Sequence, residues 1–348
     1  MTMRIIRELR RAASSIQKKF ARGALILLYH RVVELESDPQ WLCVTPQHFN
    51  EQLEVIRKGY HPMRLEHLMT ALREGSIPER AVVITFDDGY ADNLYGAKPW
   101  LEYWDIPATV YVTSGAIGSR REFWWDELER VFLQPGSLPG ELSLSISERS
   151  YRWTLNGDAH YTEERFRQYS PWNVQAEHDP SARHHLYRSL CQLLRSLPNG
   201  ARQEALEKIR EWAGSQPMSR STHRPLSPDE VVQLAQGGLI DVGAHTVTHA
   251  RLAALPLAAQ REEIQGSKAH LEDIVGYPIY RFAYPYGTRS DYTRKTVALV
   301  REAGFTQACS NFPGKVRRGN DSFQLPRFLI RNWDGDEFAR LLGEWCDG

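Results

Sequence analysis

Residues 81–90 read AVVITFDDGY, in which an apolar and β-branched run ends in two aspartates and a glycine. The run predicts a strand, and the polar residues after it predict the loop at the end of that strand. Similar short runs recur along the chain and alternate with segments of helical periodicity. This alternation predicts an α/β fold with a parallel sheet and helices outside it.

The pattern around residues 81–90 extends over most of the chain. The expected strands are residues 25–29, 81–86, 108–113, 239–244, 279–284, 306–310 and 323–330. The expected helices are residues 46–58, 65–73, 92–104, 257–275, 292–303 and 336–344. About seven strands fit either a barrel or an open doubly wound sheet, and the pattern alone does not separate these two folds.

Residues 119–224 interrupt the strand–helix rhythm. The segment is too long for a plain loop and holds helix-like runs near residues 186–197 and 201–212. We expect a helical insertion, or cap, over one mouth of the fold. Residues 24–118 and 225–348 would then form the main α/β domain.

Residues 1–23 predict a basic amphipathic helix. Its apolar residues recur at helical spacing and are Ile5, Ile6, Leu9, Ala13, Ile16 and Phe20. Such a helix could lie on an anionic membrane surface or pack on its own domain. It lacks the long apolar run of a signal peptide, and no stretch of the sequence suggests a transmembrane span.

Charge and cysteine usage limit the classes of partner. Lysine plus arginine equals aspartate plus glutamate, at 43 each, so bulk electrostatics give no reason to expect a nucleic acid. The four cysteines show no CxxC spacing, which favours neither a zinc knuckle nor a disulfide scaffold. We therefore expect reduced thiols in a cytoplasmic protein, with membrane association through residues 1–23 left open.

Three polar clusters follow three of the expected strands. They are Asp87-Asp88-Gly89, the segment His245 to His249, and Tyr284-Pro285-Tyr286-Gly287. The carboxyl ends of parallel strands meet on one side of an α/β fold, where ligands bind. We therefore expect the three clusters to converge on one site.

His245 and His249 are spaced i, i+4, so on a helical turn both imidazoles would reach one ion. Many such pairs are only neighbours on a surface helix. A carboxylate from another strand end would complete a two-His, one-carboxylate set, which is typical of an open catalytic zinc site. Of two adjacent aspartates, one could bind the metal while the other moves protons, although Asp-Gly is also common in solvated turns.

The three clusters resemble the signature blocks of a known family. TFDDGY at residues 85–90, HTVTH at 245–249 and FAYPYG at 282–287 are similar to motifs of the polysaccharide deacetylases, also called carbohydrate esterase family four or the NodB homology domain. The resemblance covers roughly residues 24–118 and 225–338. It implies a distorted (β/α) barrel of about seven parallel strands, a divalent metal that is usually zinc, and removal of acetyl groups from sugars.

The resemblance also implies residue roles. Asp87 matches the base that takes a proton from the attacking water, and Asp88, His245 and His249 match the three metal ligands. Tyr286 matches the residue whose backbone N–H stabilises the oxyanion. A Lewis-acidic metal, a carboxylate base and one amide donor are together the groups that amide hydrolysis needs.

The sequence departs from the family at the arginine that orients the base. Many members carry an arginine directly before the Pro-Pro-Tyr-Gly stretch, and this chain has Ala283 there. Arg281 lies two residues earlier and could share a strand face with Ala283. We therefore predict Arg281 at the substrate site, with its reach to Asp87 left open.

The second departure concerns the catalytic acid. Family members place a histidine in a Leu-x-His near the chain end, whereas this chain has Leu329 followed by Arg331. Leu28-Tyr29-His30 is itself a Leu-x-His, at the end of the first expected strand. Because the first and last strands of a closed barrel are neighbours, we assign His30 as the acid. The alternative is a buried, hydrogen-bonded histidine at a strand end.

The segment FWWDELE at residues 123–129 resembles the aromatic-acid block of the family. Trp124 or Trp125 could wall the sugar pocket, and we assign Trp125 to substrate binding. Asp126 could tune the acid or simply favour the start of a helix.

These observations predict a metal-dependent deacetylase acting on an N-acetylated sugar in glycan or polysaccharide biosynthesis, with Zn²⁺ as the expected metal. A cytoplasmic location would suit a lipid- or nucleotide-linked sugar. Two alternatives stay open: a non-catalytic carbohydrate-binding protein that kept the metal ligands, and a hydrolase of a non-sugar amide.

Overall fold

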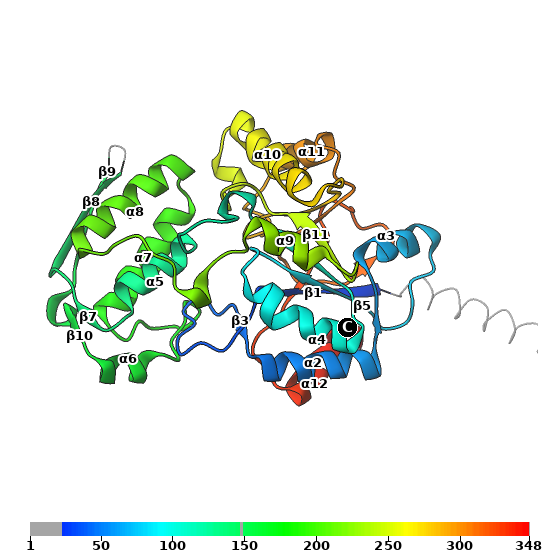
Figure 1. The fold of residues 1–348 in the computed structure, drawn as a ribbon, viewed down its shortest axis with the longest axis horizontal. Coiled ribbons are helices and arrows are strands. Elements are labelled where there is room, and N and C mark those ends of the chain that lie inside the picture. Colours follow the sequence, from blue (N-terminus) through cyan, green and yellow to red (C-terminus); the bar gives the residue numbers. More distant parts are fainter. Residues whose placement is uncertain (1–22, 147–148, 348) are drawn as a thin grey trace, which may run out of the picture.

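The computed structural model describes residues 23–146 and 149–347 (Figure 1). The amphipathic helix expected over residues 1–23 therefore lies, except for Gly23, outside the described residues. Within the described ranges, every helix is too short or too polar to cross a membrane.

The main domain is built on one curled, mostly parallel sheet. Its central strands are β13 (Gln307–Cys309), β12 (Arg281–Ala283), β11 (Ile240–Ala244), β6 (Ala108–Val112), β5 (Ala81–Phe86) and β1 (Gly23–Tyr29), in that spatial order. All five pairings between them are parallel. The short strand β15 (Phe328–Leu329) adds a seventh parallel strand beside β1. This arrangement confirms the predicted α/β barrel-like fold.

One segment near the end of the chain links the two edges of this sheet. The Leu325 N–H donates to the Ala308 carbonyl beside β13, at 3.0 Å, and the Ile330 N–H donates to the Leu28 carbonyl of β1, at 2.9 Å. Two further short strands lie near the starts of the central strands: β14 (Val316–Arg317) is antiparallel to β1, and β4 (His61–Pro62) is parallel to β5. The first and last parallel strands are therefore neighbours, as the assignment of His30 required.

Helices cover the outside of the sheet. They are α2 (Pro46–Gly59), α3 (Leu65–Glu74), α4 (Lys98–Trp104), α9 (Pro228–Ala235), α10 (Leu257–Val275), α11 (Arg294–Glu302) and α12 (Gly335–Asp347). In α2, Thr45 caps the first turn and Pro46 takes the first helical position, where the missing N–H costs nothing. Phe49, Leu53 and Ile56 then fall on one face and enter the core.

Residues 119–224 form a second lobe, drawn mainly in green in Figure 1, with a hydrophobic core of their own. The lobe holds α5 (Trp124–Phe132), α6 (Glu163–Tyr169), α7 (Ala182–Arg195) and α8 (Asn199–Ala213). It also holds β7 (Gly136–Ser137), β8 (Glu141–Ile146), β9 (Arg149–Thr154) and β10 (His160–Tyr161). The insertion therefore holds the expected helices together with short strands that the sequence did not predict. β8 alternates exposed and buried residues, which is the pattern of a hairpin with one covered face.

Candidate metal centre

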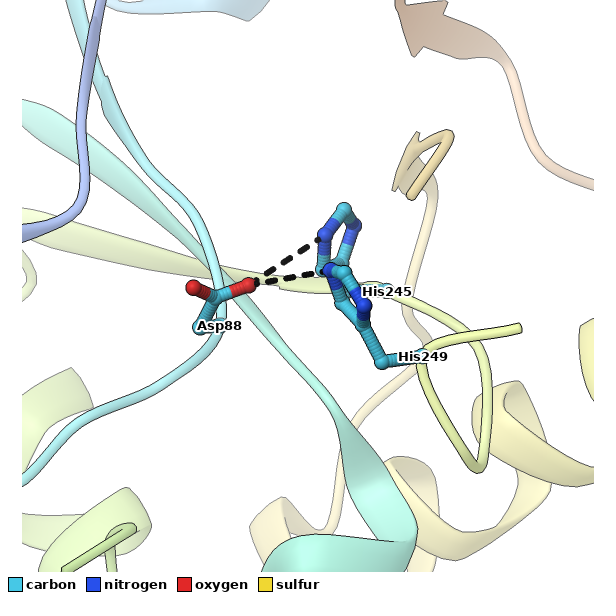
Figure 2. Close-up of side chains that lie close together, drawn as sticks. All are labelled: Asp88, His245 and His249. Carbon is cyan, nitrogen blue, oxygen red and sulfur yellow. Dashed lines mark ion pairs between the residues drawn. The ribbon is translucent and has the colours of Figure 1, made fainter. Parts of the chain in front are cut away.

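Asp88, His245 and His249 come together at the carboxyl ends of β5 and β11 (Figure 2). Asp88 Oδ1 lies 3.6 Å from His245 Nε2 and 3.3 Å from His249 Nε2. All three side chains are buried, and Asp88 Oδ1 has no hydrogen-bond partner among the described residues. A buried carboxylate oxygen left unpaired beside two imidazole nitrogens fits a divalent cation such as Zn²⁺.

The surroundings of both histidines favour the neutral form that a metal requires. Burial lowers the pKa of both rings, and it lowers the pKa of His249 to about 3. His245 Nδ1 lies 2.8 Å from the Ala283 carbonyl, which can only accept, so Nδ1 carries the proton and Nε2 keeps its lone pair. His249 Nδ1 has no such partner within the described chain.

The loops that carry these groups hold strained backbone. Four non-glycine residues of the site have positive φ: Asp88 at 75°, Thr246 at 64°, His249 at 55° and Tyr286 at 61°. Such conformations are unfavourable and persist where surrounding contacts enforce them. His245 and His249 therefore converge through a tight, irregular turn, and the predicted helical turn is wrong.

A carboxylate and a glycine allow these loops to keep their conformation. The Glu263 carboxylate on α10 accepts from the amides of Val247 and Thr248, both at 2.9 Å. Gly89 has φ of 85°, and a Cβ there would lie 2.7 Å from Val112 Cγ1. The glycine of the Asp-Asp-Gly motif is thus required both by conformation and by space.

Asp87 forms a buried, two-pronged salt bridge with Arg327. Both Arg327 NH groups donate to the two carboxylate oxygens at 2.7 Å, and the arginine is fully buried. Burial raises the pKa of Asp87, but the Arg327 charge and its hydrogen bonds outweigh burial and lower the pKa to about 2. Asp87 is therefore an oriented, ionised carboxylate beside His245, with 3.9 Å between Asp87 Oδ2 and His245 Nε2.

The prediction that Arg281 reaches the site is wrong. Arg281 lies at the start of β12 and pairs with Glu66 at 3.0 Å and Asp241 at 3.3 Å. The clusters follow the other ends of the strands, so the length of β12 separates Arg281 from the site. Arg327, which precedes β15, takes the expected place beside Asp87.

His30, the predicted acid, lines the same cavity as Asp87 and Asp88. Its ring makes no hydrogen bond to another residue of the described ranges, which disagrees with the alternative of a hydrogen-bonded structural histidine. Burial lowers the pKa of His30 to about 4, and Arg331 and Arg327 add to this effect against the two aspartates. The ring is therefore neutral near pH 7 and must take up a proton before it can act as an acid.

The cavity has a volume of about 400 Å³, and both lobes line it. Trp125 forms part of its wall, as predicted, with its ring centroid 4.9 Å from that of His249. The Trp125 indole N–H donates to the Tyr90 hydroxyl at 2.7 Å, and this hydroxyl donates to Asp126. Asp126 itself does not line the cavity; burial raises its pKa to about 8.

Tyr286 also lies at the cavity, between His249 and Arg195. Its ring centroid is 4.8 Å from the His249 ring, and the Arg195 guanidinium carbon is 4.2 Å from the Tyr286 ring centroid. The backbone N–H of Tyr286 has no acceptor within the described chain, so it is available to a ligand oxygen.

Sequence reasoning missed four cationic side chains of the site: Arg188, Arg195, Arg327 and Arg331. Arg327 had a detectable signal, because an arginine inside the otherwise apolar LPRFLI run must find a partner if that run is buried. Arg195 had none, since it sits in an ordinary amphipathic helix.

Comparisons with known proteins agree with this geometry. A family model for polysaccharide deacetylase matches residues 74–137 and 205–308. These stretches include the three clusters and leave out His30 and Arg327. The chain is 33% identical over 88 residues to the poly-beta-1,6-N-acetyl-D-glucosamine N-deacetylase of Escherichia coli K12, which is 25% of this chain but only 13% of that relative's length.

Solved structures support the fold. The Streptococcus pyogenes deacetylase PplD, in complex with acetate, matches with a TM-score of 0.56 and 17% identity, over 92% of this chain and 98% of that one. IcaB from Ammonifex degensii matches with a TM-score of 0.56 and 17% identity, over 94% and 97% of the two chains. The motifs, the fold and the family model agree: the segments of this chain that carry the three clusters match the polysaccharide deacetylase family.

Proposed function

We propose that this protein is a metal-dependent deacetylase that removes the acetyl group from an N-acetylated sugar. The observation that carries the proposal is the buried set Asp88, His245 and His249, with the ionised Asp87 beside it at the base of a cavity. Unpaired ligand atoms and an oriented carboxylate in one cavity are what amide hydrolysis by water requires.

Asp88, His245 and His249 would hold the metal, for which we propose Zn²⁺. When bound, the metal would supply Lewis acidity toward the acetamide carbonyl and toward water. Asp87 accepts a proton from the attacking water. Arg327 occupies both Asp87 oxygens, so the carboxylate cannot rotate and keeps one face toward the ligand set.

Two donors act on the substrate in this proposal. The free Tyr286 amide donates to the carbonyl oxygen as negative charge develops on it. His30, at the end of β1, relays to the departing amine the proton that Asp87 takes from the water, as the C–N bond breaks. Trp125 packs against the sugar ring, since an aromatic face suits the apolar face of a pyranose.

The sugar itself is inferred from similarity. The curated relative named above acts, by its name, on poly-beta-1,6-N-acetyl-D-glucosamine, and we propose a glucosamine-type N-acetyl sugar for this chain. A lipid- or nucleotide-linked sugar, a cytoplasmic location and membrane contact through residues 1–23 stay hypotheses from the sequence.

Acetate release tests the proposal. The zinc-loaded protein would be incubated with beta-1,6-linked N-acetylglucosamine oligomers and with nucleotide- and lipid-linked N-acetyl sugars, and free acetate would be quantified. We expect release from at least one of them and none from Asp88→Asn. The control is Asp105→Asn at a solvent-exposed position, which should release acetate like the unmodified protein, and the proposal fails if no N-acetyl sugar releases acetate above the level of Asp88→Asn.

A specific observation favours a second candidate, a carbohydrate-binding protein without turnover: Arg331 stands where the family has its acidic histidine. His30→Ala separates the two functions. For an enzyme with His30 as acid we expect kcat to fall about 10²- to 10³-fold with little change in KM. Unchanged kcat would refute the role of His30, and sugar binding without acetate release by the unmodified protein would favour the binding function.

A further inference from the structure

A second cavity, of about 270 Å³, lies behind the metal centre. It shares His249 and Trp124 with the substrate cavity, so these two side chains separate the two spaces. Its other walls include Thr113 at the end of β6 and Arg202 on α8. The main domain and the insertion thus both build it.

Several buried polar atoms in the lining of this cavity have no hydrogen-bond partner among the described residues. Among the described residues, the unpaired atoms of its lining are Thr113 Oγ1, Trp124 Nε1, Arg202 Nε, one Arg202 NH group and His249 Nδ1. All four side chains are at least nine-tenths buried. Buried polar groups in proteins are nearly always hydrogen-bonded, so these unpaired atoms indicate that the cavity holds a polar occupant.

The unpaired atoms are mostly donors. The indole and guanidinium nitrogens can only donate, and His249 Nδ1 donates whenever Nε2 offers its lone pair to a metal. The hydroxyl of Thr113 can do either. An occupant of this cavity must therefore be mainly an acceptor.

Arg202 adds a positive charge without a carboxylate partner within the described chain. Its remaining NH group donates to the Thr248 carbonyl at 2.7 Å and to Asn199 Oδ1 at 3.2 Å, both neutral acceptors. Other buried arginines differ, since Arg327 pairs with Asp87 and Arg210 pairs with Glu127. An unpaired buried cation is unfavourable, and a bound anion would neutralise it.

The two carboxylates that line the cavity do not neutralise the charge of Arg202. Glu122 accepts from Arg220 at 2.8 Å, and Glu127 accepts from Arg210 at 2.7 Å, so each is already neutralised from outside the cavity. Arg121, the other arginine of the lining, pairs with Glu207 at 3.6 Å. Arg202, whose guanidinium carbon lies 5.9 Å from the Trp124 ring centroid, is therefore the charge that an incoming ligand would meet without a carboxylate partner.

We propose that this second cavity is a binding site for a small carboxylate, and that its ligand is acetate. A carboxylate accepts at both oxygens, which suits donors arriving from Arg202, Trp124 and His249. The volume equals about nine liquid waters, ample for a two-carbon anion. The identification as acetate rests on the proposed function, because deacetylation produces acetate on the other side of His249.

Calorimetric titration of sodium acetate into metal-free protein tests the site, with ionic strength held constant. Without metal, acetate cannot ligate a metal ion in the substrate cavity. We expect saturable binding by the unmodified protein and at least tenfold weaker binding by Arg202→Met. The matched control is Arg121→Met, which alters the same cavity at a paired arginine and should bind acetate unchanged.

Trp124→Phe provides a second, gentler variant in case Arg202→Met does not fold. It removes one donor, the indole N–H, and should weaken acetate binding several-fold. No saturable binding by the unmodified protein would overturn the proposal and leave water as the occupant. Equal binding by Arg202→Met would overturn it by placing the anion elsewhere, and equally tight chloride binding would replace acetate with a halide.

These outcomes are separable from the proposed function because no turnover is measured. Acetate binding that depends on Arg202, in a protein that deacetylates nothing, would refute the proposed function and acetate's role as product, but not the anion site. Deacetylation without Arg202-dependent binding would refute the site alone.

Discussion

Two groups of buried carboxylates, one beside α5 in the insertion and one at the metal centre, differ in their pairing. In the insertion, the carboxylates of Glu122 and Glu127 on and before α5 are each paired with an arginine. In the main domain, Asp88 keeps an oxygen that no group of the described chain satisfies. Paired charges specify how elements pack, whereas an unpaired buried ligand atom lowers stability and is retained for binding. The contrast separates residues that hold the lobe together from residues that act.

The largest effect that tests this contrast is expected at the metal centre. Asp88→Asn removes a charged ligand, and we expect zinc affinity to fall at least about 100-fold and acetate release at least about 10³-fold. The metal-free variant should be as stable as the unmodified metal-free protein or more stable, because an unpaired buried charge is gone. Zinc titration and urea unfolding of both metal-free proteins measure these effects. A clear loss of stability without metal would contradict the contrast.

Arg327→Met removes the partner of Asp87, whose two carboxylate oxygens both accept from Arg327. We expect acetate release to fall about 10²-fold and the free energy of unfolding to fall by ~3–5 kcal/mol, because Asp87 is left as a buried, unpaired charge. The control is Arg281→Met, whose ion pairs lie at the other ends of the strands and should matter little.

The pH dependence of Arg327→Met sharpens this prediction. In the unmodified protein the Asp87 pKa is about 2, below its unfolded value near ~3.9, so the pair contributes stability above pH 4 that is lost as pH falls toward 2. Without Arg327, burial would raise the Asp87 pKa. The acidic limb of the kcat/KM profile should then move to higher pH, and an unmoved limb would argue against Asp87 as the base.

Arg195→Met tests a contribution of the insertion to the substrate cavity. Arg195 packs over the Tyr286 ring and shares Asp291 with Arg251, so Asp291 keeps a partner when Arg195 is lost. We expect KM to rise about tenfold and kcat to change less than threefold, as for a group that only binds. Arg251→Met, which loses an Asp291 contact outside the cavity, should leave both constants near their original values. Loss of kcat would show that the insertion shares in the chemistry.

Asp126→Asn has the smallest expected effect and concerns the junction of the lobes. The Asp126 pKa of about 8 lies above its unfolded value near ~3.9, so its contribution is complete below pH 4 and is lost as pH rises toward 8. The amide does not titrate and can still accept from Tyr90. Urea unfolding across pH 4–8 should show a flatter profile for the variant, and parallel profiles would contradict this.

The residues of the ligand set could be predicted because each follows directly from a local pattern. A strongly apolar run predicts a strand, and its end predicts where Asp87 and Asp88 stand. The same reasoning located His245, His249 and Tyr286. Local patterns could not show that His245 and His249 meet through positive φ, since spacing i, i+4 also fits a helix.

Long-range pairing explains which site residues could not be predicted correctly from the sequence. Arg327 was missed because its partner lies 240 residues away and no periodicity links the two. Arg281 was preferred because it stands two residues from the expected position, yet strand direction carries it to the other end of β12. His30 was found by a topological argument, that a barrel brings its first and last strands together, and β1 indeed pairs with β15.

The distance along the chain between Asp87 and Arg327 also has a consequence for biosynthesis. At ~5–20 residues per second, the 240 intervening residues take roughly 10–50 s to be translated. Throughout that interval the nascent chain carries an acidic strand end without its counter-charge, and β1 lacks its β15 neighbour. The Asp87–Arg327 pair can therefore form only late in synthesis. Chains that stall before residue 327 would expose a sheet that lacks β15 to chaperones and proteases.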